Sequence, residues 1–158
     1  MKSILHPVSY VVIALFVAGL AVGQLLVPIV AQDMARQFPE VTHLVTPYSV
    51  LGIATIACFQ ICLILFGVLL YRGTRDELYT DTSRTLIKAM AAIAVVGCLI
   101  PVAVAIHLLT TMHAGGPGVL LGIIAALVSA VAFASLGALV LRAFDITRAE
   151  HTELEAVI

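Results

Sequence analysis

Charged residues are scarce in this 158-residue sequence, and tryptophan is absent. Asp, Glu, Lys and Arg make up 11% of the chain, whereas they make up about a quarter of a typical soluble domain. Hydrophobic residues make up 62%, which is more apolar surface than a soluble core of this length buries. The composition therefore excludes an ordinary soluble domain. The net charge of −1 also excludes the strongly basic surface of a nucleic-acid-binding protein.

The sequence also lacks the motifs of enzymes and pumps. No side chains have the spacing of a catalytic acid, base or nucleophile, so we expect no enzymatic activity, no catalytic residue and no cofactor. No Asp or Glu lies within the long apolar runs, although transporters usually carry an ionisable group or a broken helix near the membrane midplane. Weakly polar groups such as Gln24, Gln60 and Thr55 remain, and we expect them to bridge helices.

Four long apolar runs are the main positive feature. They cover about residues 8–31, 47–71, 86–112 and 118–141, and each is long enough to cross the hydrocarbon core as a helix. The first run is much longer than the apolar part of a signal peptide, so we expect it to be retained. We predict an all-α integral membrane four-helix bundle with short outer loops, forming one transmembrane domain over residues 1–158.

The basic residues predict the orientation. Only Arg36 lies between the first and second runs. The other seven lie at the chain ends, between the second and third runs, or, for Lys88, near the start of the third run: Lys2, Arg72, Arg75, Arg84, Lys88, Arg142 and Arg148. Because cytoplasmic loops carry an excess of Lys and Arg, we predict that both termini are cytoplasmic.

Small residues recur at intervals of four along the last run. They are Gly118, Gly122, Ala126, Ala130, Ala134 and Ala138. Because lipid gives little hydrophobic drive between helices, small side chains favour association by allowing close packing. We expect this stripe to pack within the monomer, and a homo-oligomer interface is the alternative. Gly19 and Gly23 form a GxxxG pair in the first run.

Of the three prolines in the apolar runs, Pro47 begins the second run and the other two lie inside their runs. Pro28 is close to the end of the first run, and we interpret it as helping to end that helix. Pro101 lies in the middle of the third run, where the loss of a backbone donor predicts a kink.

The three cysteines raise the hypothesis of a metal site in the membrane. Cys58 and Cys62 are four residues apart in the second run, and Cys98 lies at a similar depth in the third. Clustered thiols bind copper or haem iron. However, buried thiols are common small hydrophobic residues, and no His or Met lies at a matching depth. We therefore predict no metal site there.

An outward-facing metal site is a second hypothesis. Several candidate ligands fall near the outer surface: His43, His107, His113, Asp33, Met34, Glu40 and Met112. None of the histidines, His6 and His151 included, has the spacing of a HxH or HExxH motif. We therefore interpret the outer histidines as interfacial residues.

The charged segments 72–85 and 142–158 are the predicted cytoplasmic surfaces. Thr74 and Glu77 have the spacing of a capping box, and residues 81–83 are candidate caps for the third helix. We expect the fourth helix to continue for a turn or two into an acidic tail. This tail could dock on the basic loop or on a partner, or remain solvated.

Short motifs carry a family resemblance. They are the Pro28 end of the first run, LLYRG at 69–73, LYTDTSRTLIKAM at 78–90 and TELEAVI at 152–158. With four spans and both ends inside, the chain resembles the bacterial membrane proteins known as domain of unknown function 2975 (DUF2975). The family often has an aromatic-Ser pair in the loop, where this chain has Leu78, Tyr79 and Thr80.

The resemblance implies a bacterial inner-membrane protein without an established activity. Some family members are encoded beside small helix-turn-helix regulators, which implies a cytoplasmic regulator of that kind as a partner. We predict a non-enzymatic protein of regulatory or accessory role that acts through its cytoplasmic loop and tail. The alternatives are an oligomeric channel or small-molecule carrier, and an outward-facing metal or lipid sensor.

Overall fold

The computed structural model describes residues 2–37, 39–75, 77–111 and 116–155. This part of the chain is helical, and each of its four long helices is long and apolar enough to cross a membrane. The elements are α1 (Lys2–Gln37), the short 3₁₀ helix η1 (Pro39–Leu44), α2 (Val45–Thr74), α3 (Asp81–Thr111) and α4 (Pro117–Glu155). The all-α membrane architecture predicted from the apolar runs is therefore confirmed.

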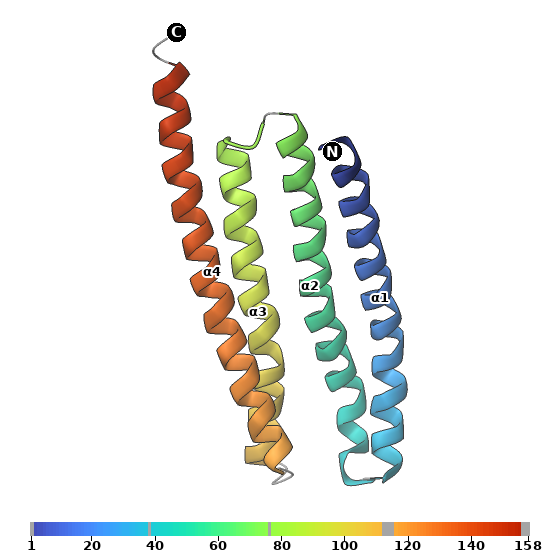
Figure 1. Cartoon of the computed structure of the whole chain (residues 1–158). Helices are drawn as coiled ribbons and strands as arrows, with labels where there is room; N and C mark the ends of the chain where they lie inside the picture. Colours follow the sequence, from blue (N-terminus) through green and yellow to red (C-terminus); the bar gives the residue numbers. More distant parts are fainter. Residues whose placement is uncertain (1, 38, 76, 112–115, 156–158) are drawn as a thin grey trace.

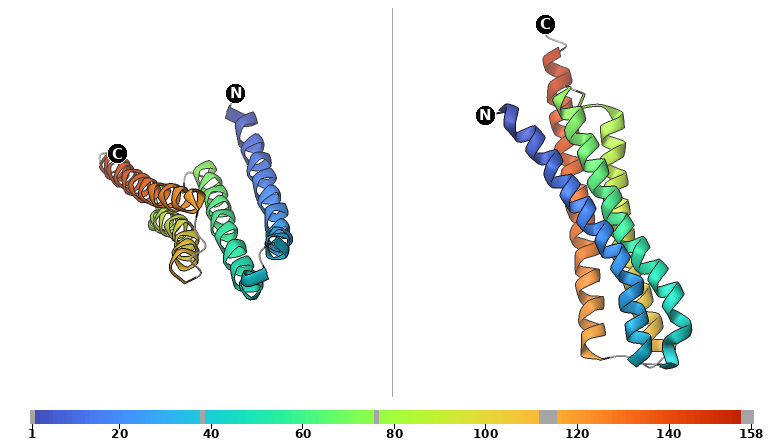
Figure 2. Two further views of the ribbon diagram at one scale, coloured as in Figure 1. Left: turned by 90° about the horizontal axis from the view of Figure 1, so that it is seen from below. Right: turned by 90° about the vertical axis from the view of Figure 1, so that its right-hand side faces the viewer.

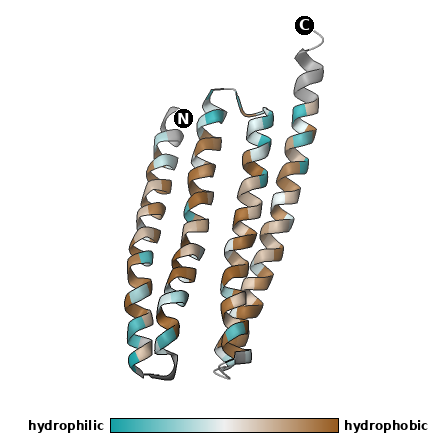
Figure 3. Ribbon diagram, turned by 180° about the vertical axis from the view of Figure 1, so that it is seen from behind, coloured by the Kyte–Doolittle hydropathy of each residue, from teal (hydrophilic) through white to brown (hydrophobic). Residues whose placement is uncertain are grey.

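The long helices alternate in direction (Figure 1). The start of α1, the α2–α3 connection and the end of α4 lie at one end of the molecule, which we call the charged end. The η1 segment and the start of α4 lie at the opposite end. Hydrophobic residues predominate along the middle of the helices, as expected for segments in contact with lipid (Figure 3).

The helices pack in chain order: α1 on α2, α2 on α3 and α3 on α4 (Figure 2). Within the described residues, the backbone of α1 approaches neither α3 nor α4. The bundle is therefore open, and its least buried helix, α1, exposes large side chains such as Leu15 and Leu25, which are 67% and 71% exposed. Lipid can solvate these side chains, so they need no protein partner.

Each neighbouring pair of long helices contains one glycine at a close approach. A side chain added there would press against the facing helix, so glycine permits the backbones to come together. The distances from an added Cβ atom are as follows: Gly52 to Val27 Cγ1 3.1 Å, Gly97 to Cys58 Cβ 3.0 Å, and Gly137 to Ala91 Cβ 2.5 Å.

The small-residue stripe of α4 packs on α3 only in part. Residues four apart drift by about 40° around a helix of 3.6 residues per turn, so a long stripe leaves the contact face. Ala130 is buried, whereas Ala134 and Ala138 are exposed. Gly118 and Gly122 have no neighbouring atom near an added Cβ. The expected packing of this stripe within the monomer is therefore observed at Ala130 and is absent at the exposed Ala134 and Ala138.

On the face of α4 that packs on α3, the contact residues are instead seven positions apart. Ala130 and Phe144 are buried, and Gly137, midway between them, is the close-approach glycine. This spacing is typical of helices that cross at a small angle.

Neither Pro28 nor Pro101 ends its helix. Helix α1 continues past Pro28 to Gln37, so the interpretation of Pro28 as a helix end is wrong. Helix α3 likewise continues past Pro101. Membrane helices tolerate proline because neighbouring groups and local adjustments satisfy the freed carbonyl.

Candidate functional site

One arginine organises the turn between α2 and α3 at the charged end. The carbonyl oxygen of Arg72 accepts hydrogen bonds from the backbone N–H groups of Arg75 and Glu77, both at 3.1 Å. The guanidinium of Arg72 donates to Ser83 Oγ at 3.2 Å and to Thr80 Oγ1 at 3.0 Å. It also lies 3.7 Å from the Glu77 carboxylate. Because Ser83 is fully buried, these contacts supply partners that its hydroxyl needs.

The helix ends at this turn differ from the predicted caps. The hydroxyl of Thr74 donates to the carbonyl three residues earlier, at 2.7 Å, because α2 continues through Thr74. The predicted capping box with Glu77 is therefore wrong. At the start of α3, the N–H of Ser83 donates to Thr80 Oγ1 at 3.4 Å. Thr80 thus occupies the capping position, one residue before the predicted caps at 81–83.

The extension of α4 is attached to the start of α3. Helix α4 continues for about four turns beyond Leu141, longer than the predicted turn or two. Two guanidinium nitrogens of Arg84, Nε and Nη2, donate to the two oxygens of the Asp145 carboxylate, at 2.8 and 2.9 Å. Arg148 donates to Asp81 at 2.5 Å. The hypothesis that the tail docks on the loop region is confirmed for this part of the tail.

A ring contact supports the same docking. The rings of Tyr79, in the turn, and Phe144, on α4, have centroids 5.9 Å apart. Phe144 is buried, so the contact joins the ion pairs to the packed interior. Exposed ion pairs alone hold helices weakly, but the bidentate geometry and this buried ring together fix one register of α4 against α3. The side chains of Glu150, His151, Glu153 and Glu155 lie outside the described residues.

An apolar groove of about 570 Å³ lies next to the charged end, between α2, α3 and α4. Two side-chain hydrogen bonds join its described lining residues: the Cys62 thiol donates to the Met90 carbonyl at 3.4 Å, and the Thr147 hydroxyl donates to the Ala143 carbonyl at 3.0 Å. The rings of Phe59 and Phe133, 6.1 Å apart, bring α2 and α4 together near it. Such a lining suits hydrocarbon and offers no array of polar groups for a hydrophilic substrate.

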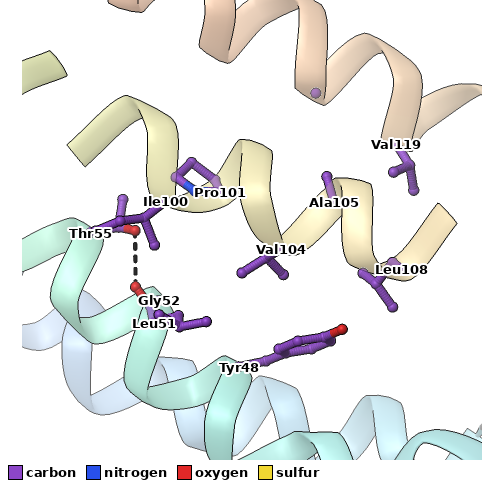
Figure 4. A pocket seen from close by; sticks show the side chains of 11 residues that line it. Tyr48, Leu51, Gly52, Thr55, Ile100, Pro101, Val104, Ala105, Leu108 and Val119 are labelled. Atoms are coloured by element: carbon purple, nitrogen blue, oxygen red, sulfur yellow. Dashed lines mark hydrogen bonds between the residues drawn. The ribbon is translucent and has the colours of Figure 1, made fainter. Parts of the chain in front are cut away.

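A smaller pocket of about 320 Å³ lies toward the opposite end (Figure 4). Tyr48, Val104 and Leu108 line it from α2 and α3. The Tyr48 hydroxyl is hydrogen-bonded to His107 Nδ1 at 2.6 Å, and the two rings meet edge to face. The Thr55 hydroxyl donates to a carbonyl of its own helix at 2.9 Å. The polar groups lining this pocket are therefore already paired.

A glutamine pair joins α1 to α2 in the apolar region. The amide of Gln24 donates to Gln60 Oε1 at 2.9 Å, and Gln60 donates in turn to the Val17 carbonyl at 3.3 Å. Polar side chains in lipid favour such contacts between helices. The expectation that such groups bridge helices is confirmed for Gln24 and Gln60, whereas Thr55 donates within its own helix.

The two metal hypotheses gain no cluster of ligands from the described residues. In this part of the chain, no three side chains of His, Cys, Asp or Glu lie close enough to hold an ion. Cys98 is buried, and Cys58 and Cys62 are half-buried free thiols. His43 is exposed on η1, and His107 is bonded to Tyr48. The other outer candidates His113 and Met112, and the side chains of Met34 and Glu40, lie outside the described residues.

Four long apolar helices joined in chain order define a multi-pass helical membrane protein. The chain belongs to the family described as Protein of unknown function (DUF2975), whose sequence profile matches residues 29–158. The match begins within α1 and includes the whole of the charged end except the start of α1, which confirms the resemblance found in the sequence. No curated protein and no solved structure matches the chain.

Proposed function

We propose that this protein is a non-enzymatic inner-membrane protein of regulatory or accessory role that holds a cytoplasmic partner at its charged end. The observation that carries the proposal is the attachment of the α4 extension to α3 by the Arg84–Asp145 and Arg148–Asp81 pairs. This attachment gives a defined helical platform beyond the apolar part of the molecule. The distribution of basic residues supports a cytoplasmic position for this end and for both termini.

The chemistry of the tail favours a basic partner. After Arg148 the sequence contains Glu150, Glu153 and Glu155 and no Lys or Arg. Acidic side chains on a projecting helix resemble the phosphate backbone of DNA in charge, so they suit the basic face of a small DNA-binding protein. A helix-turn-helix regulator held in this way would be unable to use that face on DNA. This is the partner that the family resemblance implies.

Site-specific photocross-linking in living cells tests the proposal. The full-length protein carries a benzophenone amino acid at Ala149, and a control carries it at His43, which lies at the opposite end. We expect an adduct with a basic DNA-binding protein from position 149 and none from position 43. A Glu150→Gln, Glu153→Gln, Glu155→Gln variant should lower the adduct yield several-fold at equal expression.

Two outcomes contradict the proposal. One is recovery of only lipid or self adducts from position 149. The other is an equal yield of the regulator adduct from both probe positions. Equal yields would show that the regulator collides with the protein at random and prefers neither end.

A further inference from the structure

Within the described part of α3 and α4, two basic residues at the charged end have no ion-pair partner at hydrogen-bonding distance. Lys88 on α3 and Arg142 on α4 are both exposed. Lys88 follows Arg84 by four residues, and Arg142 precedes Asp145 by three, so each lies about one turn nearer the apolar middle than the Arg84–Asp145 pair. Lys88 is also within electrostatic reach of the Asp145 carboxylate. The two residues therefore lie on the same face as that ion pair.

This face has an excess of positive charge. It has four cations and two carboxylates, so two positive charges are uncompensated. The cations are Arg84, Lys88, Arg142 and Arg148, and the carboxylates are Asp81 and Asp145. Their depth, at the start of one apolar run and just beyond the end of another, corresponds to the headgroup region of a bilayer. Long basic side chains near helix ends reach toward that region.

The surface next to the basic pair is apolar and has small side chains. Ala134 and Ala138 precede Arg142 at intervals of four, and Ala92 follows Lys88 by four, so they lie below these two residues on α4 and α3. All three alanines are exposed and leave room beside the helices. An acyl chain can lie there while its headgroup stays at the level of the basic side chains.

We propose that the α3–α4 face bearing Lys88 and Arg142 binds an anionic phospholipid through its phosphodiester group. The charge excess selects an anionic over a zwitterionic headgroup, because juxtamembrane basic residues attract anionic lipid. The acyl chain occupies the surface over Ala134 and Ala138. This site is independent of the partner proposed above, since that partner is held by the acidic tail.

Electron paramagnetic resonance of spin-labelled lipids tests this site. The full-length protein is reconstituted in phosphatidylcholine vesicles with a trace of spin-labelled phosphatidylglycerol or spin-labelled phosphatidylcholine. For each labelled lipid, the spectrum gives the fraction whose motion the protein restricts. The two fractions together give the relative affinity of the protein for the two lipids. We expect the wild-type protein to prefer phosphatidylglycerol by about 25-fold, that is, by about fivefold for each of the two basic residues near the headgroups.

The Lys88→Gln, Arg142→Gln variant should bring this preference close to one. The matched control, Lys2→Gln with Arg75→Gln, removes the same charge from the same end but from α1 and the turn, and it should keep the preference. The conservative Lys88→Arg, Arg142→Lys variant should keep it too, which separates charge from misfolding. The proposal is overturned by a preference unchanged in Lys88→Gln, Arg142→Gln, by an equal loss in the control pair, or by no preference in the wild-type protein.

Discussion

At the scale of single residues, Arg72 and Gly137 carry the most specific roles. Both the carbonyl and the guanidinium of Arg72 form hydrogen bonds within the α2–α3 turn. One of the partners is the hydroxyl of the fully buried Ser83. Gly137 provides the close approach of α4 to α3. Neither role can be predicted from the sequence. Each depends on a partner residue in another segment, and the sequence does not indicate where that segment lies in the fold.

Replacing Arg72 should destabilise the turn. In Arg72→Met the apolar stem is kept and the donors are lost, so two hydroxyls lose a charged partner, at a cost of about 1–3 kcal/mol. Arg75→Met is the matched control, because Arg75 is exposed and stacks on the Tyr71 ring without serving a buried group. Thermal unfolding in a mild detergent measures both variants. Equal midpoints for the two would contradict the role given to Arg72.

Adding one methyl group at Gly137 should separate α3 from α4. The new Cβ atom would lie 2.5 Å from Ala91 Cβ, so Gly137→Ala should cost about 1–3 kcal/mol through overpacking. Gly122→Ala on the same helix meets no atom within 4 Å, and the higher helix propensity of Ala should make it neutral or slightly stabilising. The same thermal assay compares them, and a Gly137→Ala variant as stable as Gly122→Ala would refute the close approach.

At the scale of elements, the length of α4 is the main departure from the sequence prediction. The apolar run ends near residue 141, and the sequence alone indicated a turn or two beyond it. The helix continues to Glu155, with Asp145 and Arg148 paired to residues of α3 more than sixty positions earlier. Pattern and composition predicted where the membrane segments lie. They could not predict the helix extension because its stabilising partners come from another helix.

Exchanging the charges of one ion pair tests this attachment. Asp145→Arg should speed amide hydrogen exchange in the α4 extension several-fold, because it places like charges beside Arg84 and Arg148. The double variant Arg84→Asp, Asp145→Arg should restore much of the protection. Mass spectrometry measures the exchange rates of these variants. If the amides of the α4 extension in Asp145→Arg were as protected as in the wild-type protein, the ion pair would not hold the helix.

At the scale of the whole molecule, the described parts of the helices form an open series, and within them only α2 and α3 have long-helix neighbours on both sides. The sequence predicted the number of spans and their alternating direction, because apolar length and charge determine both. It did not predict the open packing. Lipid solvates an apolar side chain about as well as another helix does, so hydrophobicity alone does not specify which helices meet.

The orientation of the charged end is the claim on which the proposed function depends. In a background with Cys58, Cys62 and Cys98 replaced by alanine, single variants His43→Cys and Thr74→Cys place one exposed thiol at each end of the molecule. A membrane-impermeant maleimide is added to spheroplasts and, in parallel, to lysed membranes. We predict that His43→Cys is labelled in both and Thr74→Cys only after lysis. Labelling of Thr74→Cys in intact spheroplasts, with His43→Cys protected, would contradict the account.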